Sequence, residues 1–170
     1  MTAAAADISA FFQVVEGQAQ GGWSWTYHEE KHYWKATYAR SLPPCEIFAE
    51  INGACLCLQM EFGELRVRPE CRTAFQFLLL RLNDDLAVVK FGLGRTGQVT
   101  LMAEVPAVQV TLAVFADLLR AIVAVAGQYR REVELLATDP SLAALVARMS
   151  DDGSVRAVSI SVGPSVRTKL

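Results

Sequence analysis

Residues 45–62 read CEIFAEINGACLCLQMEF, and this stretch decides the fold. Apolar side chains occupy every second position on both sides of Asn52-Gly53, which is the period of a half-buried β-strand. Asn-Gly is the strongest two-residue hairpin signal because both turn positions take a positive φ. With this loop, Ile51 lies opposite Ala54 and Ile47 opposite Leu58, so both apolar sets share one face of a sheet. The other face carries Glu46, Phe48, Glu50, Cys55, Cys57, Gln59 and Glu61.

A second hairpin is predicted from residues 87–105. Apolar side chains alternate over Ala87–Leu93 and again over Val99–Val105, all at odd positions. The two sets share a sheet face only if the loop between them has an odd number of residues. The five residues Gly94–Gln98 satisfy that condition, so we expect them to form the loop.

Helices are predicted around these strands. Residues 5–20 place Ile8, Phe11, Phe12 and Val15 on one helical stripe. Further helices are expected from Pro69 to Asn83, from Leu112 to Leu136, and from Pro140 to Met149 with Asp139 as its cap. A short strand is predicted over Val155–Val162. The aromatic-rich residues 23–40 stay open between a hairpin and part of a helix.

The order of elements predicts the fold class. Helix, three strands, helix, two strands and a long helix give an α+β fold with an antiparallel sheet of about five strands and a C-terminal helical extension. The 170 residues are enough for one domain. We assign residues 1–138 to the α+β domain and residues 139–170 to a short helix and a partly mobile tail.

Composition excludes several function classes. The 16 basic and 18 acidic side chains give a net charge of −2, which predicts no nucleic-acid partner. Gln109, Asp117 and Arg120 interrupt the most apolar window, so no membrane span or membrane partner is expected. The first residues lack the pattern of a signal peptide, and four cysteines are too few for a disulfide framework. We therefore expect a cytoplasmic protein.

The stretch His28-Glu29-Glu30-Lys31-His32 matches the zinc-hydrolase pattern H-E-x-x-H. On a helix, the two histidines would lie one turn apart and hold zinc, with Glu29 as the general base. However, β-forming aromatic residues flank the motif, and the chain has no third histidine. We expect a solvated turn and no metal site, and we keep a small zinc-dependent hydrolase as the alternative function.

Two further patterns resemble chemical motifs. Gly92-Leu93-Gly94-Arg95-Thr96-Gly97 matches G-x-G-x-x-G, but a dinucleotide site needs a helix next, and a strand-like run follows instead. Cys55-x-Cys57 lacks both the spacing of a metal or redox motif and a second ligand pair. We therefore predict no catalytic residues and no cofactor.

The element order resembles the type III secretion chaperone fold and the related YbjN family. Residues 75–83, FQFLLLRLN, are similar to the family's helix that ends in Leu-x-x-Leu-Asn. Residues 85–93 (DLAVVKFGL) are similar to the strand that follows it, and residues 97–106 (GQVTLMAEVP) to the partner strand. The resemblance covers about residues 8–137. It implies a small cytosolic protein, often dimeric, that binds peptide segments of other proteins without catalysis.

The function predicted from the sequence is therefore a non-enzymatic, chaperone-like protein that binds a protein or peptide client. A structural subunit with one permanent partner is a third alternative. The candidate partner-binding residues are Trp34, Tyr38, Glu46, Phe48 and Glu50. On the second helix, Phe77 and Leu80 point away from the stripe that covers the sheet. We expect them to lie at the interface of a homodimer.

Overall fold

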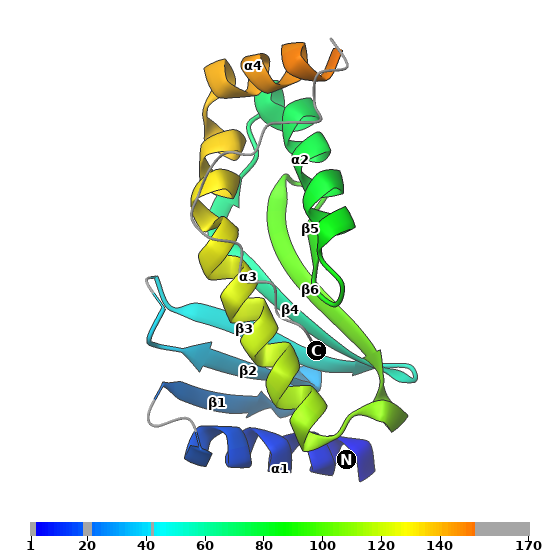
Figure 1. Ribbon diagram of the computed structural model, residues 1–170. Coiled ribbons are helices and arrows are strands. Elements are labelled where there is room, and N and C mark those ends of the chain that lie inside the picture. Colours follow the sequence, from blue (N-terminus) through cyan, green and yellow to red (C-terminus); the bar gives the residue numbers. More distant parts are fainter. Residues whose placement is uncertain (1–2, 19–21, 42, 152–170) are drawn as a thin grey trace.

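Among the described residues, six antiparallel strands form a sheet in the order β1-β2-β3-β4-β6-β5 (Figure 1). The computed structural model describes residues 3–18, 22–41 and 43–151. The strands are β1 (Trp23–His28), β2 (Tyr33–Tyr38), β3 (Cys45–Asn52), β4 (Cys55–Arg66), β5 (Lys90–Leu93) and β6 (Gln98–Pro106). The predicted α+β class is confirmed, with six strands in place of about five.

The helices of the described chain are α1 (Ala3–Gln18), α2 (Arg72–Asp85), α3 (Leu112–Thr138) and α4 (Pro140–Asp151). Three short 3-10 turns accompany them: η1 (Glu29–Lys31), η2 (Pro69–Cys71) and η3 (Ala107–Gln109). In Figure 1, α3 crosses one face of the sheet, α1 lies along β1, and α2 lies beside β5. The predicted helices fall at these places, with their ends shifted by a few residues.

The helices and one face of the sheet enclose the core. Phe12 of α1 packs edge-on against Phe115 of α3, with 4.8 Å between the ring centroids, and stacks on Trp25 of β1 at 5.7 Å. The largest fully buried side chains are Trp34, Ile47, Leu56, Leu58, Met60, Phe75, Val99, Leu101, Phe115, Leu119, Ile122 and Val133. The strand residues among them alternate along their strands. Their neighbours therefore point to the opposite side of the sheet.

No described helix packs on that opposite side, which we call the uncovered face. Its central side chains are Tyr33, Lys35 and Thr37 of β2, Glu46, Phe48 and Glu50 of β3, Cys55, Cys57, Gln59 and Glu61 of β4, and Thr100, Met102 and Glu104 of β6. An antiparallel sheet with one covered face is stable in water because its second face can remain solvated.

The β3–β4 hairpin keeps the predicted faces but not the predicted pairing. Ile47 lies opposite Met60, not Leu58, and Ile51 lies opposite Leu56, not Ala54. The turn consists of Gly53-Ala54, closed by the pair Asn52–Cys55. Gly53 has a φ of 60°, whereas Asn52 and Ala54 are outside the left-handed region. This is the pattern of a II′ turn, with glycine first, and the prediction assumed an I′ turn with Asn52 first.

The open question about residues 23–40 is settled by the pairing of β1 with β2. Trp23 lies opposite Tyr38 and His28 opposite Tyr33, so the stretch forms an antiparallel hairpin. Trp34 is 1% exposed, and its indole Nε1 donates a hydrogen bond to Ser9 Oγ on α1 at 2.9 Å. The aromatic residues therefore build the sheet and anchor α1 to it.

The β5–β6 hairpin confirms the predicted parity. Leu93 lies opposite Val99 and Phe91 opposite Leu101, so the five residues Gly94–Gln98 lie between the last paired residues of the hairpin. The strand β5 begins at Lys90, three residues later than the predicted Ala87. Gly97 has a φ of 78°, and its backbone oxygen accepts a hydrogen bond from the Val67 N–H at 2.9 Å.

The cap of the fourth helix is also confirmed. The Asp139 carboxylate accepts hydrogen bonds from the backbone N–H groups of Ser141, at 2.9 Å, and Leu142, at 3.3 Å, and Pro140 occupies the first helical position. α4 packs against α2 and α3. The strand predicted over residues 155–162 lies outside the described residues.

By length and composition, α3 is the one helix of the described chain that passes a test for a membrane span. In the fold, however, Phe115, Leu119 and Ile122 form a buried stripe on this helix, each at most 1% exposed. A core helix with such a stripe passes the same test, so the observation is weak evidence for a membrane span.

Candidate functional site

The uncovered face contains a shallow groove of about 290 Å³. Its lining residues come from three neighbouring strands: Tyr33 from β2, Phe48 and Glu50 from β3, and Cys57, Gln59 and Glu61 from β4. The strand register places them in rows, with Tyr33, Glu50 and Cys57 side by side, and Phe48 beside Gln59 in the next row. The groove is therefore positioned by backbone pairing in the middle of the sheet.

Two aromatic rings form one wall of the groove. The centroids of Tyr33 and Phe48 lie 5.7 Å apart with an interplanar angle of 63°, an edge-to-face arrangement. The Nζ atom of Lys35 lies 5.9 Å from the Phe48 centroid and 2.7 Å from Glu46 Oε1. Phe48 is only half-buried, so it offers apolar surface to a molecule that lies along the strands.

The predicted partner-binding residues divide between the two faces of the sheet. Glu46, Phe48 and Glu50 lie on the uncovered face, and Phe48 and Glu50 line the groove. Trp34 lies in the core instead of at a surface, and Tyr38 is half-buried on the same covered side, 4.8 Å from Trp23 between ring centroids. The register explains this division, because Trp34 and Tyr38 share the parity of the buried positions of β2.

Sequence reasoning missed Tyr33, Cys57, Gln59 and Glu61 as groove residues. The last three were predicted on the correct face, but nothing in their spacing indicated a hollow. The alternation over Tyr33–Tyr38 could have placed Tyr33 on the uncovered face. It predicts this only if residues 23–40 are already known to form a hairpin. The register also moves Cys57 from the predicted place opposite Phe48 to one opposite Glu50.

The H-E-x-x-H motif does not adopt the helix that its zinc chemistry requires. His28 ends β1, Glu29–Lys31 form the 3-10 turn η1, and His32 has a φ of 53°. His28 stacks on Tyr33 at 4.5 Å, whereas His32 Nδ1 lies 3.2 Å from the hydroxyl oxygen of Tyr27. No group of three metal-ligating side chains occurs among the described residues. The structure therefore gives no support to the hydrolase alternative.

The glycine-rich motif is a hairpin loop. Gly94 donates its N–H to the Gln98 carbonyl at 2.8 Å, and Gly97 donates its N–H to the Gly94 carbonyl at 3.0 Å. β6 follows directly, so the loop leads into a strand and not into a helix. The loop geometry is that of a strand connection and lacks the anion cradle of a dinucleotide site.

The pKa values of the two thiols on the uncovered face are raised. A hydrogen bond with Glu104 raises the pKa of Cys55, and desolvation, followed by the charges of Glu104 and Glu50, raises the pKa of Cys57. A raised pKa lowers the thiolate fraction, which is the nucleophilic and metal-binding form. All four cysteines, Cys45, Cys55, Cys57 and Cys71, are free.

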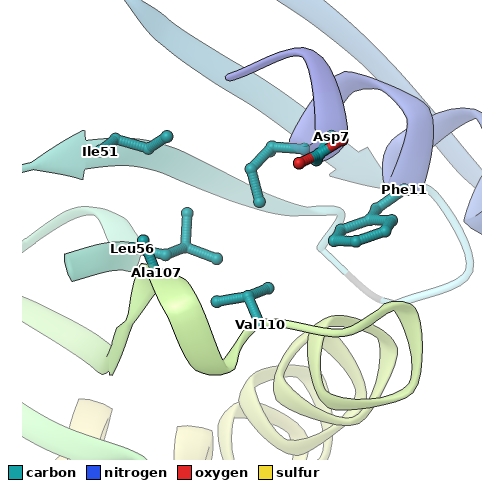
Figure 2. A pocket seen from close by; sticks show the side chains of 7 residues that line it. Asp7, Phe11, Ile51, Leu56, Ala107 and Val110 are labelled. Carbon is teal, nitrogen blue, oxygen red and sulfur yellow. The ribbon is translucent and has the colours of Figure 1, made fainter. Parts of the chain in front are cut away.

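A second, smaller hollow of about 40 Å³ lies between α1, the β3–β4 hairpin and η3 (Figure 2). Its lining is apolar apart from one carboxylate: Asp7, Ile8, Phe11, Ile51, Leu56, Ala107 and Val110. Its volume is close to that of one water molecule. It offers neither a nucleophile nor a pair of acid and base groups.

Phe77 and Leu80 lie on the outer side of α2 and are 51% and 68% exposed. Neither α3 nor α4 covers them, although both helices pack on other sides of α2. The sequence predicted that α2 carries more apolar surface than its own sheet can cover. Phe77 and Leu80 are that surplus, and both are exposed within one chain.

Comparison with solved structures shows distant likenesses to this chain, of which one is described here. No family model and no curated protein matches the chain. A chain in the crystal structure of the ExsC–ExsE complex is similar to this one, with a TM-score of 0.47 and 17% sequence identity. The match covers 79% of this chain and 97% of that chain.

Proposed function

We propose that the protein is a non-enzymatic, chaperone-like binder that holds an extended segment of a partner protein against the uncovered face of its sheet. The observation that carries this proposal is the groove between Tyr33, Phe48 and Gln59, which opens on a face that no described helix covers. A chain in extended conformation presents side chains at about the spacing of strand residues, so it can place alternate side chains in such a groove.

The β5 edge of the sheet is already occupied, which favours binding on the face over pairing with this edge. At the β5 edge, the Asn83 side chain already occupies the backbone N–H and C=O of Phe91. A client strand can pair with this edge only if it displaces Asn83. The groove needs no such rearrangement, because its wall is formed by side chains that already face solvent.

We also propose that the chain is a member of the YbjN family. The support is that the residues of the Leu-x-x-Leu-Asn motif together hold α2 and the start of β5 in place. Leu79 and Leu82 are on the buried side of α2, and Asn83 at its end forms hydrogen bonds with the edge of β5. A family motif with this role specifies the α2–β5 corner of the fold and leaves the client open.

The proposal includes a homodimer in the cytoplasm. Phe77 and Leu80 form an apolar patch on α2, and a two-fold interface would bring the patch against its own copy. Four free thiols favour a reducing compartment.

The test of the binding function is a random peptide display library selected against the intact protein, followed by fluorescence anisotropy of the enriched peptides. We expect micromolar binding that Phe48→Ala weakens about tenfold or more, because the substitution removes one aromatic wall. Val108→Ala is the control, since it removes an exposed apolar side chain from η3, away from both the groove and the apolar patch on α2. Failure to enrich any peptide, or equal loss of binding in both variants, would contradict the proposal.

A further inference from the structure

Among the described residues, some carboxylates around the groove form an ion pair or a contact with a neighbouring side chain, and others do not. Four carboxylates share the uncovered face: Glu46, Glu50, Glu61 and Glu104. Glu46 forms an ion pair with Lys35, and Glu104 lies close enough to Cys55 to raise the pKa of its thiol. No described residue forms an ion pair with Glu50 or Glu61, the two carboxylates that line the groove.

Apart from Lys35, the basic side chains of the sheet strands, Arg66 and Lys90, form contacts away from the groove. Lys90 donates hydrogen bonds to the carbonyl oxygens of Asn83 and Leu86 at the end of α2. Arg66 donates to the carbonyl oxygens of Gly63 and Leu65. These contacts hold both cations at the end of the sheet or at its edge, so the groove keeps a negative field.

The Cys57 thiol lies next to two of these four carboxylates. Cys57 lies on the floor of the groove, opposite Glu50 on β3 and Glu104 on β6. After desolvation, the charges of these two carboxylates are the next largest causes of its raised pKa. The same charges that disfavour a thiolate at this point favour a cation there.

Lys35 shows, within the chain, which kind of side chain suits this surface. Its ammonium nitrogen lies 5.9 Å from the centroid of the Phe48 ring and 2.7 Å from the carboxylate of Glu46 on β3. An aromatic face with a neighbouring carboxylate binds a long basic side chain through cation–π attraction and charge. Phe48 and Tyr33, with Glu50 and Glu61, present the same combination in the empty part of the groove.

We propose that the groove selects a basic client segment, in which an arginine or lysine side chain lies against Tyr33 and Phe48 and its cationic head contacts Glu50 and Glu61. This inference rests on the proposed binding function and adds the chemistry of the bound side chain. The client is an extended peptide that carries at least one arginine or lysine among apolar residues.

The test uses an arginine-containing peptide from the library and a second peptide with that arginine replaced by glutamine. With the wild-type protein, we expect the arginine peptide to bind about tenfold more tightly, and its advantage to shrink as salt is raised. Glu50→Gln with Glu61→Gln is expected to remove most of the advantage. The charge-matched control, Glu16→Gln with Glu30→Gln, removes two exposed acids on α1 and η1 and is expected to keep it.

The outcomes separate the two proposals. If both peptides bind equally and Phe48→Ala weakens both, the basic-client inference is overturned and the binding function stands. If neither peptide binds, the binding function fails. If Arg156→Gln, Arg167→Gln and Lys169→Gln together raise the affinity for the arginine peptide, a basic segment of the chain itself competes for the groove, and the assignment to a client is overturned.

Discussion

The Asn83 side chain forms two hydrogen bonds with the backbone of Phe91. Its Nδ2 donates to the Phe91 carbonyl at 2.9 Å, and its Oδ1 accepts from the Phe91 N–H at 2.7 Å. β5 is an edge strand of the sheet, so without Asn83 these two backbone groups would be unpaired at an open edge. The amide replaces one residue of a missing neighbouring strand and protects the edge against pairing with another chain.

Replacing Asn83 with alanine is expected to lower the free energy of unfolding by about 1–3 kcal/mol, because two backbone groups beside the buried Phe91 side chain lose their partners. Urea unfolding followed by circular dichroism measures the change. Asn83→Asp is the matched comparison. It keeps the acceptor and loses the donor, so we expect a clear loss of stability here too. Wild-type stability in the alanine variant would show that the two hydrogen bonds between Asn83 and Phe91 contribute nothing to stability.

Gly97→Ala is expected to destabilise the β5–β6 hairpin by on the order of 1–2 kcal/mol. Gly97 has a φ of 78°, and a Cβ there would lie 3.2 Å from the Val67 carbonyl oxygen. Gly94→Ala is the control in the same loop, because its nearest neighbour would lie at 3.5 Å and its φ is not positive. Equal effects of the two substitutions in urea unfolding would contradict the conformational argument.

Asp139 makes part of the stability dependent on pH. Its hydrogen bonds with Ser141, first through the side chain, lower the pKa of its carboxyl below the value of an unfolded chain. This contribution is therefore present above the unfolded pKa of about 3.9 and is lost as the pH falls through the lower folded pKa. In thermal unfolding between pH 7 and pH 2, Asp139→Asn keeps the cap and should lose stability less steeply in acid than the wild type. If the stability of the wild type and of Asp139→Asn falls equally with pH, Asp139 is not the source of this pH dependence.

The dimer proposal predicts a molar mass in light scattering of twice the 18.6 kDa of one chain. Phe77→Glu is expected to shift the protein to a monomer with unchanged circular dichroism, since the side chain is exposed within one chain and a charge there opposes a self-contact. Val108→Glu serves as the control, as Val108 is exposed on η3, away from α2. A wild-type protein that is monomeric at tens of micromolar would show that no such dimer forms.

The face of the sheet on which each residue lies was predictable, because the alternation of apolar residues determines it. The pairing between strands was less predictable, because it depends on the type of turn. Ile47 and Ile51 fall on the covered face under either register, because the observed shift of two residues preserves parity. The partners of Phe48 and Glu50 were wrong, since Asn52-Gly53 fits an I′ turn in sequence and the chain forms a II′ turn at Gly53-Ala54.

The candidate site was predictable only in part, for a related reason. Glu50 and Phe48 follow from one hairpin, but the wall formed by Tyr33 requires the pairing of β2 with β3, which joins segments through a loop of irregular sequence. Trp34 was predicted as a partner-binding residue of the aromatic stretch 23–40. Its indole is instead satisfied by Ser9, a contact between α1 and β2 that no local pattern encodes.

The most direct measurement of the central claim is the amide spectrum of the isotope-labelled protein, recorded by nuclear magnetic resonance during titration with an arginine-containing peptide from the library. We predict that the largest shifts occur on β2, β3 and β4, around Tyr33, Phe48 and Gln59. The signals of the outer side of α2 should move little. Shifts concentrated on α2 or α3, or no shifts at saturating peptide, would contradict binding on the uncovered face.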